Sequence, residues 1–398
     1  MSMRIIFHID VNNAYLSWHS IDALKKGSTI DYRTIPAIVG GDEEARHGIV
    51  LAKSFPAKEK GVVTAEPIFQ AKRKCPGLKI LKPLPHVYKH YSDLMFALIR
   101  SYTPDIEIMS VDECYLDYTK VKKLYGDPIK FAHKLKDEIK DRLGFTVNIG
   151  IANTKVCAKM ASDFKKPDRV HTLFQEEIQE KMWPLPIEKL YMTGKKSVIK
   201  LKEMGIHTIG DLANFPLDRL KRIFKSKATL MYEFAWGIDE REVNSVREQY
   251  KCISQEITLP RDYEKVKELE ELLKNLAYNI AYRLRENNFY AYVVEVHLKN
   301  HQFKSFSHQI KLKNPINTTA DIYKNAVRLL HEMYHDDKIR LIGIRVNDFT
   351  ERQTVQYSLF DQVETSKKEE KVERIMDEIN RKYGTQSISY ATQKKIDK

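Results

Sequence analysis

Two adjacent carboxylates lie between strand-like apolar runs in SVDECYLDYT, residues 110–119. Asp112 and Glu113 repel each other when both are ionised, so each raises the pKa of the other. A solvated turn is the simplest interpretation, because short acidic side chains are common in turns. The alternative is a site for a divalent cation such as Mg2+, which prefers carboxylate oxygens and relieves the repulsion. That alternative requires a third acid from elsewhere in the chain.

Asp10 is the candidate for the third acid. It ends the apolar run RIIFHID, which predicts a buried strand. In a ferredoxin-like sheet this strand lies beside the hairpin that carries Asp112 and Glu113. Three carboxylates are enough for two divalent ions about 3.5–4 Å apart, which hold the attacking and leaving oxygens in phosphoryl transfer. Rigid strands suit such chemistry, because an in-line displacement tolerates little misplacement.

The elements around the acids are predicted in the order strand, hairpin, helix, strand, helix. After the first strand come a hairpin over 101–119, a helix over 127–144, a strand over 145–151 and a helix over 153–164. Asn153 is the expected N-cap of the last helix. This order predicts a ferredoxin-like α+β sheet with helices on one side, interrupted by a separate insert at residues 13–83.

The C-terminal half contains a helical region and a second mixed unit. Residues 174–238 are predicted to be wholly helical, and residues 239–250 are charged and aperiodic, which favours a linker. Residues 251–350 have the order β-α-β-β-α-β of a split βαβ sheet. Residues 351–398 are polar, with one short helix predicted around KVERIMDEINRKYG.

The composition indicates a partner of opposite charge. The 398 residues carry a formal net charge of +13, which on a folded protein favours nucleic acid or another polyanion. The four cysteines are far apart, so we expect neither a disulfide framework nor a zinc ribbon, and we expect a reducing cytoplasm. The first residues do not have the form of a signal peptide, and no apolar run is long enough for a membrane span.

Three stretches together carry a family resemblance: FHIDVNNAYLSW, SVDECYLD and GIANTKVCAKMASDFKKPDRV. The chain resembles the Y family of translesion DNA polymerases, near its bacterial DNA polymerase IV (DinB) group. The resemblance covers residues 4 to about 361 and implies template-directed DNA synthesis of low fidelity. It assigns the regions as palm (1–12 and 84–173), fingers (13–83), a thumb of helix-hairpin-helix type (174–238), linker (239–250), little finger (251–350) and tail (351–398).

The resemblance also assigns roles to residues near the acids. Asp10, Asp112 and Glu113 match the family's catalytic, metal-binding acids, and the backbone carbonyl of Val11 matches an additional ligand. The implied cofactor is a pair of Mg2+ ions, for which Mn2+ can substitute. Tyr15 matches the steric gate, an aromatic ring that collides with the 2′-OH of a ribonucleotide; without the resemblance, core packing is the favoured interpretation.

Three further positions match residues that bind the incoming dNTP. Lys166 matches a phosphate-binding lysine, although by itself it would be assigned to the surface. Phe55 stands where the family has a tyrosine that donates a hydrogen bond to the triphosphate, and Lys58 stands where many members have arginine. Phe55 lacks the hydroxyl, and Lys58 offers a point charge instead of a planar fork. We therefore expect weaker triphosphate binding.

Other departures from the family's pattern concern the residues that lie over the new base pair and the residues of the thumb. Ile49 and Leu51 are bulky where the family often has small residues, which argues against a generous range of lesions, and Ala14 stands beside the gate where an aromatic residue is usual. Met192 and Thr193 replace part of a Gly-x-Gly turn. The three residues that remain for contact with a DNA phosphate are Gly194, Lys195 and Lys196.

The implied partners are primer-template DNA and dNTPs, bound by a monomer without a membrane. The strand FKSFSHQIKLK presents hydroxyl, amide and ammonium groups on one face, which suits phosphate contact. The candidate DNA-binding residues are Ser305, Ser307, Gln309, Lys311 and Lys313 on this strand, with Arg340 and Arg345 on the last strand.

A second candidate partner is the sliding clamp, a ring that encircles DNA. QYSLF, residues 356–360, resembles the Gln-x-x-Leu-Phe peptide by which bacterial polymerases bind the clamp's β subunit. Gln356 would form hydrogen bonds, and Leu359 and Phe360 would fill an apolar pocket. The alternative is a stray contact of the two apolar residues with their own domain.

Other classes of protein are compatible with parts of the sequence. HEMYH, residues 331–335, has the zinc-protease spacing, with His331 and His335 as ligands and Glu332 as base. His86 with His90, and His297 with His301, are weaker candidates for metal pairs. A catalytically weak polymerase-like subunit that only binds DNA is a further alternative. A nucleotide cyclase or reverse transcriptase on a similar palm is disfavoured by the helical region and the second split βαβ unit.

Overall fold

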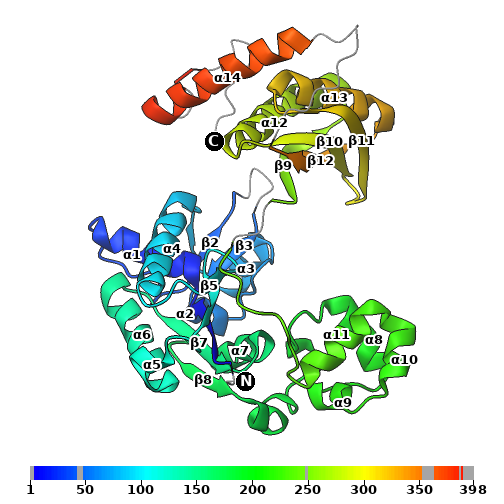
Figure 1. The fold of residues 1–398 in the computed structure, drawn as a ribbon. Coiled ribbons are helices and arrows are strands. Elements are labelled where there is room, and N and C mark those ends of the chain that lie inside the picture. Colours follow the sequence, from blue (N-terminus) through cyan, green and yellow to red (C-terminus); the bar gives the residue numbers. More distant parts are fainter. Residues whose placement is uncertain (1–3, 43–47, 247–249, 352–362, 385–386, 389–398) are drawn as a thin grey trace. The chain divides into compact units, whose positions relative to one another are not determined.

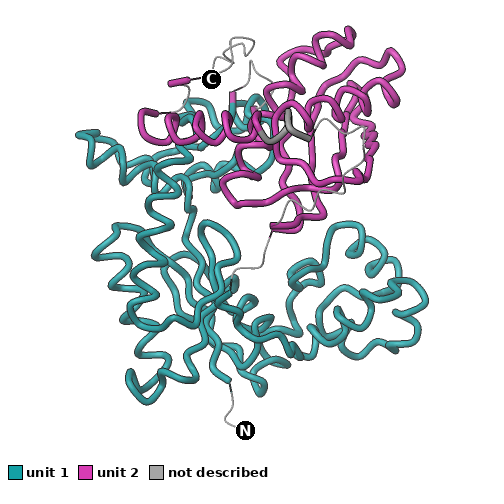
Figure 2. Tube along the Cα trace, turned by 45° about the horizontal axis from the view of Figure 1, so that its top comes forward, with its two compact units in different colours: residues 1–41, 49–247 teal, residues 42–48, 248–398 magenta. Residues whose placement is uncertain are grey.

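The computed structural model divides the chain into two compact units (Figure 2). The first comprises residues 1–41 and 49–247, and the second comprises residues 42–48 and 248–398. The structure describes all residues except 1–3, 43–47, 247–249, 352–362, 385–386 and 389–398. Among the described helices, none is long and apolar enough to cross a bilayer.

A five-stranded sheet forms the centre of the first unit (Figure 1). Its strands lie in the order β5 (Ile106–Ile108), β6 (Glu113–Asp117), β1 (Ile6–Val11), β7 (Val147–Ala152) and β8 (Val170–Leu173). β1 pairs antiparallel with both β6 and β7, and β8 pairs parallel with β7. The first four strands have the ferredoxin-like order, as predicted, and β8 extends the sheet.

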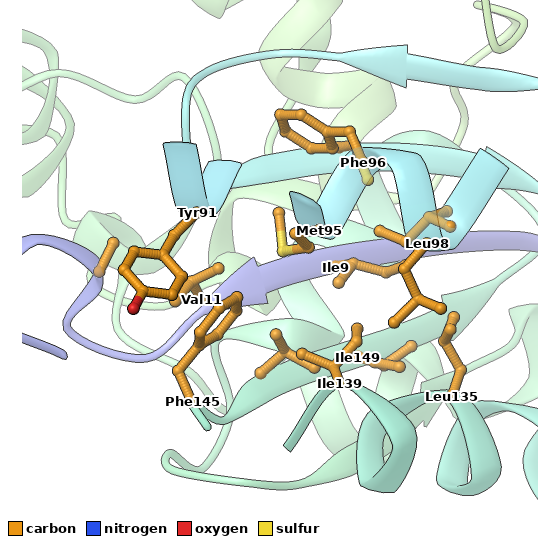
Figure 3. Packing of buried hydrophobic residues seen from close by; sticks show 14 of the residues in the cluster. Ile9, Val11, Tyr91, Met95, Phe96, Leu98, Leu135, Ile139, Phe145 and Ile149 are labelled. Carbon is orange, nitrogen blue, oxygen red and sulfur yellow. The ribbon is translucent and has the colours of Figure 1, made fainter. Parts of the chain in front are cut away.

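One face of this sheet is covered by two long helices, α4 (Pro85–Arg100) and α6 (Pro128–Leu143). Figure 3 shows Ile9 and Val11 of β1 among side chains of these helices and of β7. Ile9 is completely buried, and burial of such a side chain contributes roughly 1.5–3 kcal/mol. The alternation along β1 that buries Ile9 here turns Asp10 to the opposite face.

The opposite face is covered by α7 (Lys155–Ser162), so the prediction of helices on one side only is wrong. The side chains of Ile6 and Tyr115 from the sheet share a core with α7. Gly150 of β7 makes this packing possible: a Cβ there would lie 2.0 Å from the carbonyl oxygen of Ala158. Because glycine has no side chain at this strand position, α7 can lie close to the acids.

The insert between β1 and α4 has a small sheet of its own. Its strands lie in the order β3 (Val50–Lys53), β2 (Ala37–Gly40) and β4 (Lys79–Leu81), and they pack with α2 (Phe55–Glu59) and α3 (Ile68–Lys74). α1 (Ala14–Lys25) is different, because its apolar side chains, including Trp18, join the core of the large sheet.

The region after β8 is helical, as predicted. Short 3-10 and π turns between Gln175 and Lys189 are followed by α8 (Lys195–Glu203), α9 (Ile209–Ala213), α10 (Leu217–Phe224) and α11 (Ser226–Ala235). These helices share their core with α7. The segment after α11, predicted as a linker, begins within the first unit and contacts α7: Asp239 Oδ2 accepts a hydrogen bond from the backbone N–H of Val156 at 3.0 Å.

The second unit has the β-α-β-β-α-β order expected from the sequence. Its elements are β9 (Cys252–Tyr263), α12 (Val266–Glu286), β10 (Tyr290–Asn300), β11 (Ser305–Ile316), α13 (Thr319–Met333) and β12 (Ile339–Thr350). The sheet is antiparallel in the order β11-β10-β12-β9. α12 and α13 pack against each other and on one face of the sheet.

The short helix predicted around KVERIMDEINRKYG is part of a longer helix, α14 (Val363–Tyr383), which packs beside α12 (Figure 1). Arg285 of α12, with a side chain only 1% exposed, forms ion pairs with Glu373 and with Asp377, the latter at 2.7 Å. Tyr290 donates a hydrogen bond to α14 at 2.9 Å. The sequence did not predict this contact because the buried face of α14 carries charged residues, which normally face solvent.

Candidate active site

The pairing of β1 with β6 brings the three predicted acids to one end of the sheet. Asp10 lies directly opposite Glu113 in the register of the two strands. The backbone N–H of Val11 donates a hydrogen bond to the carbonyl oxygen of Asp112 at 3.0 Å. The hairpin bend therefore places Asp112 next to the end of β1, as the sequence predicted.

Two lysines lie against these acids. Lys159 of α7 places its Nζ 2.8 Å from Glu113 Oε2 and 3.5 Å from Asp10 Oδ1. Lys166 forms an ion pair with Asp10 and a second one, at 2.8 Å, with Asp163. The resemblance had predicted Lys166 at the site, but Lys159 was not predicted.

The N-cap of α7 differs from the expected residue. Thr154, and not Asn153, accepts the capping hydrogen bond, which comes from the backbone N–H of Cys157. The Asn153 side chain instead donates to the carbonyl oxygen of Arg4 at 2.9 Å. Two neighbouring residues that can both cap a helix explain the shift of one position.

The charges at the site influence one another. Burial raises the pKa of Asp112, and the negative charges of Asp10 and Glu113 raise it further. A hydrogen bond with His8 lowers the pKa of Glu113 to about 2, and Lys159 contributes to this shift. Burial opposes the charged form of Lys159, but the surrounding carboxylates outweigh it and raise the pKa of this lysine. The site therefore gathers three carboxyl groups whose mutual repulsion a nearby cation would relieve.

The chemistry of the donors fits a divalent cation. All three side chains are carboxylates, and hard cations such as Mg2+ prefer oxygen donors. As placed, no three acidic, histidine or cysteine side chains in the described part of the chain are grouped to hold a metal ion. Asp112 Oδ1 accepts a hydrogen bond from Ser110 Oγ at 2.5 Å, while the ammonium of Lys159 contacts both Asp10 and Glu113. This ammonium supplies the positive charge that the carboxylates require.

His8 is a second residue at the site that sequence reasoning missed. Its Nε2 lies 3.4 Å from Glu113 Oε2, and its side chain is 1% exposed. Burial lowers the pKa of His8, which favours a neutral ring. The period of two in the strand would have indicated its position, because His8 and Asp10 must lie on the same face of β1.

Tyr15, the predicted steric gate, lies in the first turn of α1. Its ring stacks on that of Tyr88 with 4.5 Å between centroids and an angle of 16°. Tyr15 is half-buried against the core of the large sheet. The ring is therefore held in place by packing, and its remaining surface is open.

The other predicted dNTP contacts lie in the insert. Phe55 begins α2, and the ammonium of Lys58 lies 5.9 Å from the centre of its ring. Ile49 and Leu51 are 42% and 36% exposed. Among the described residues, no hydrogen bond or ion pair joins Phe55 or Lys58 to the three acids.

The predicted DNA contacts lie on exposed surfaces of each unit. Gly194 is the N-cap of α8, and Lys195 and Lys196 are exposed in its first turn, while the preceding Met192 has a φ of 62°. Ser305, Ser307 and Gln309 are exposed on β11. Three of the cations already have neighbours: Lys311 pairs with Asp348 at 2.8 Å, Arg345 with Glu295 at 3.5 Å, and Arg340 lies over the ring of Phe303 at 4.8 Å.

The zinc-protease alternative is wrong. α13 ends at Met333, so His331 and His335 do not lie on one helical face. His331 pairs with Glu270 at 2.7 Å, and Glu332 pairs with Arg328 at 2.9 Å.

Three family models match the chain. They are described as the impB/mucB/samB family over residues 9–163, its C-terminal domain over 250–359, and the thumb domain of DNA polymerase-iota over 193–239. The fold and the carboxylates therefore define a protein of the polymerase class.

Curated relatives and solved structures agree with these models. A DNA polymerase IV of Clostridium acetobutylicum is 42% identical over 97% of each chain, and DNA polymerase IV 1 of Bacillus subtilis is 34% identical over 97% of this chain and 92% of the relative. A Y-family polymerase chimera of Dbh and Dpo4 matches with a TM-score of 0.78 and 23% identity, over 87% of this chain and 100% of that one. DinB from Sulfolobus solfataricus matches with a TM-score of 0.59 and 24% identity, over 86% and 98%. The chain belongs to the Y family of DNA polymerases.

Proposed function

We propose that this protein is a DNA-directed DNA polymerase that extends a primer opposite a template, including damaged template, by attack of the primer 3′-OH on the α-phosphate of a dNTP. The observation that supports the proposal most directly is the convergence of Asp10, Asp112 and Glu113 at one end of the sheet. This function agrees with the names of the relatives and with the net charge of +13.

The three carboxylates would hold two divalent ions, Mg2+ or Mn2+, together with the backbone carbonyl of Val11. When bound, the ions supply positive charge to the reacting phosphate and increase the nucleophilicity of the 3′-OH. Asp10 and Asp112 would be ligands shared by the ions, and Glu113 would be a ligand on the side of the primer. Lys166, which now neutralises Asp10, binds the triphosphate of the incoming nucleotide.

The insert completes the nucleotide site in this proposal. Tyr15 excludes the ribose 2′-OH, and the exposed Ile49 and Leu51 cover the new base pair. Phe55 and Lys58 lie along the triphosphate, where the missing hydroxyl and the absence of a planar guanidinium weaken binding.

The protein binds DNA through the phosphate backbone, so its binding does not depend on the base sequence. The residues proposed for it are Gly194, Lys195 and Lys196 in the thumb, and Ser305, Ser307, Gln309, Lys311, Lys313, Arg340 and Arg345 in the little finger. We further propose that the protein acts as a monomer in the cytoplasm, where its cysteines, all of them free thiols in the structure, stay reduced.

Primer extension with the purified protein tests the function directly. With Mg2+ and one dNTP at a time, we expect the nucleotide complementary to the template to be added fastest, because base pairing with the template selects the substrate, and the other three to be added more slowly. EDTA should abolish the reaction, because it removes the divalent ions that neutralise the charge on the reacting phosphate. DNA binding without extension at any Mg2+ or Mn2+ concentration would instead support a catalytically weak DNA-binding subunit.

We also propose that residues 356–360, QYSLF, bind the sliding clamp. These residues lie outside the described part of the chain, so the proposal is supported by the sequence alone. Gln356, Leu359 and Phe360 match the peptide pattern. Attachment to a ring on DNA raises the effective concentration of the polymerase at the primer without new DNA contacts.

Extension in the presence of the loaded clamp checks this interaction. Loss of two apolar anchor residues commonly removes most of the binding energy of a peptide, so Leu359→Ala/Phe360→Ala should lose the stimulation by the clamp. Synthesis without the clamp should stay at the wild-type rate, and this serves as the internal control. Equal stimulation of both proteins would refute the assignment of this peptide.

A further inference from the structure

His8 occupies a buried position directly behind the carboxylates. It lies on β1 two residues before Asp10, on the same face of the strand. Its Nδ1 is 2.8 Å from Ser162 Oγ and its Nε2 is 3.4 Å from Glu113 Oε2. The ring also packs edge-on against Tyr115, with 4.8 Å between centroids. Both ring nitrogens therefore face polar partners inside an otherwise apolar layer.

The available hydrogens limit how this group of contacts is arranged. Ser162 Oγ lies 2.8 Å both from His8 Nδ1 and from the carbonyl oxygen of Lys159, yet the hydroxyl has a single hydrogen. If that hydrogen goes to Lys159, the neutral imidazole carries its own hydrogen on Nδ1, and the lone pair of Nε2 then faces the carboxylate of Glu113. If the hydroxyl donates to Nδ1, the ring hydrogen lies on Nε2 and is donated to Glu113. Each arrangement leaves one pair of acceptors facing each other: Nε2 and Glu113 Oε2 in the first, and Ser162 Oγ and the carbonyl oxygen of Lys159 in the second. The second is favoured, because a hydrogen bond to a charged carboxylate is stronger than one to a neutral carbonyl.

We propose that His8 is a positioning residue for Glu113: supported by the hydroxyl of Ser162, it donates from Nε2 to Oε2 and fixes the orientation of this carboxylate for a divalent ion. The inference rests on the proposed function, in which Glu113 is a metal ligand. Hydrogen-bond partners behind a ligand fix its geometry, and their loss commonly lowers metal affinity or activity by about 10- to 100-fold.

Lys159 and His8 both face the same carboxylate oxygen of Glu113, which explains why the orientation of Glu113 needs a second support. Lys159 Nζ lies 2.8 Å from the same Oε2 that faces His8. A flexible glutamate held only by an ammonium on a long side chain would move with it. His8 cannot move in this way, because it is on a central strand and its side chain is 1% exposed. His8 would therefore keep one carboxylate oxygen of Glu113 in place if a metal ion replaced the ammonium of Lys159 at this carboxylate.

Two substitutions at position 8 separate the hydrogen bond from the packing. In His8→Gln the amide nitrogen reaches the place of Nε2, while in His8→Asn the shorter side chain reaches only the place of Nδ1. The readout is Mn2+ affinity of the complex with primer-template DNA, measured from the EPR signal of free Mn2+, which requires no turnover. We expect His8→Asn to weaken Mn2+ binding by about 10- to 100-fold and His8→Gln to retain most of the affinity.

Kinetics provide the second measurement. His8→Asn should raise the Mg2+ concentration at half-maximal extension and lower kcat, while the KM for dNTP and the Kd for DNA stay close to wild type. Ser162→Ala, which removes the support of the ring, should shift Mn2+ affinity in the same direction and less strongly. If His8→Asn does not fold, as judged by its Tm, the Ser162→Ala variant alone decides the matter.

Glu113→Gln is the reference for the site itself. If this variant binds Mn2+ and extends primers like wild type, the proposed metal site is wrong. If it loses both properties while His8→Asn and Ser162→Ala bind Mn2+ normally, only the positioning role is overturned. Equal losses in His8→Gln and His8→Asn that follow a loss of Tm also overturn it, because they indicate a purely structural histidine.

Discussion

Replacement of Asp112 by asparagine is expected to abolish primer extension and to leave DNA binding nearly unchanged. The substitution keeps the shape of the side chain and removes its charge, so the hairpin bend and its hydrogen bond with Ser110 can be retained. Loss of a shared metal ligand removes several kcal/mol of transition-state stabilisation, which corresponds to a fall in kcat of about a thousandfold or more. Single-turnover extension and the Kd for a labelled primer-template measure the two properties separately.

The expected result follows from the charge balance at the site. Burial and two neighbouring carboxylates raise the pKa of Asp112, so a divalent cation would relieve the repulsion at this acid. Lys159 forms ion pairs with Asp10 and Glu113, whereas Asp112 is not among the ion-pair partners of that lysine. Asparagine cannot supply the negative charge that the ion requires.

Asp105→Asn is the matched control. This acid precedes β5 in the same hairpin and forms a partly exposed ion pair with Lys120 at 3.0 Å, and such pairs contribute little to stability. Extension by the control should equal that of wild type. Full activity of Asp112→Asn would show that the chemistry takes place elsewhere, and equal loss in both variants would point to damage to the hairpin.

The convergence of the three acids was predictable because it depends on strand order and on alternation along strands. RIIFHID and the hairpin around SVDECYLD have clear patterns, and a ferredoxin-like order leaves one way to place them side by side. The face covered by α7 was not predictable in the same way. It depends on a single residue, Gly150, whose missing side chain matters only when the approach of Ala158 is known.

Lys159 and His8 were missed for a related reason. In both cases the contact that matters comes from a distant part of the sequence: α7 carries Lys159 to the end of β1, and Glu113 of β6 and Ser162 of α7 lie against the ring of His8. A lysine on a helix and a histidine in an apolar strand have no local pattern that distinguishes a functional role from surface or core. The packing of α7 on the sheet brings Lys159 into contact with Glu113, whereas the pairing of β1 with β6 brings His8 there.

α14 shows the limit of hydrophobic patterning. Its residues Glu370, Glu373 and Asp377 are at most 9% exposed, although their types are those of a solvent face. The partner that makes burial of Glu373 and Asp377 acceptable is Arg285, on a helix about ninety residues earlier in the chain, while Glu370 accepts hydrogen bonds from Tyr290 and Asn317. Buried charges are stable only when paired and hydrogen-bonded. The sequence of α14 alone therefore suggests a polar tail, and the sequence of α12 alone suggests an exposed arginine.

Removal of the ring of Tyr15 should let ribonucleotides enter the polymerase site. The ring stacks on Tyr88 at 4.5 Å, so it cannot easily withdraw from a 2′-OH. Forcing extra atoms into a packed site costs about 1–3 kcal/mol, or roughly 5- to 150-fold in rate. In Tyr15→Ala we expect the ratio of kcat/KM for dCTP to that for CTP to fall by this factor, chiefly through faster use of CTP.

Tyr15→Phe is the matched control, because it keeps the ring and its stacking and removes only the hydroxyl. It should discriminate between the two nucleotides as wild type does. Since Tyr15 also packs on the core, the Tm of each variant must be measured, and a general loss of activity with both nucleotides would reflect destabilisation. If Tyr15→Ala stays folded and its preference for dCTP is unchanged, Tyr15 contributes packing only, and another side chain excludes the ribose.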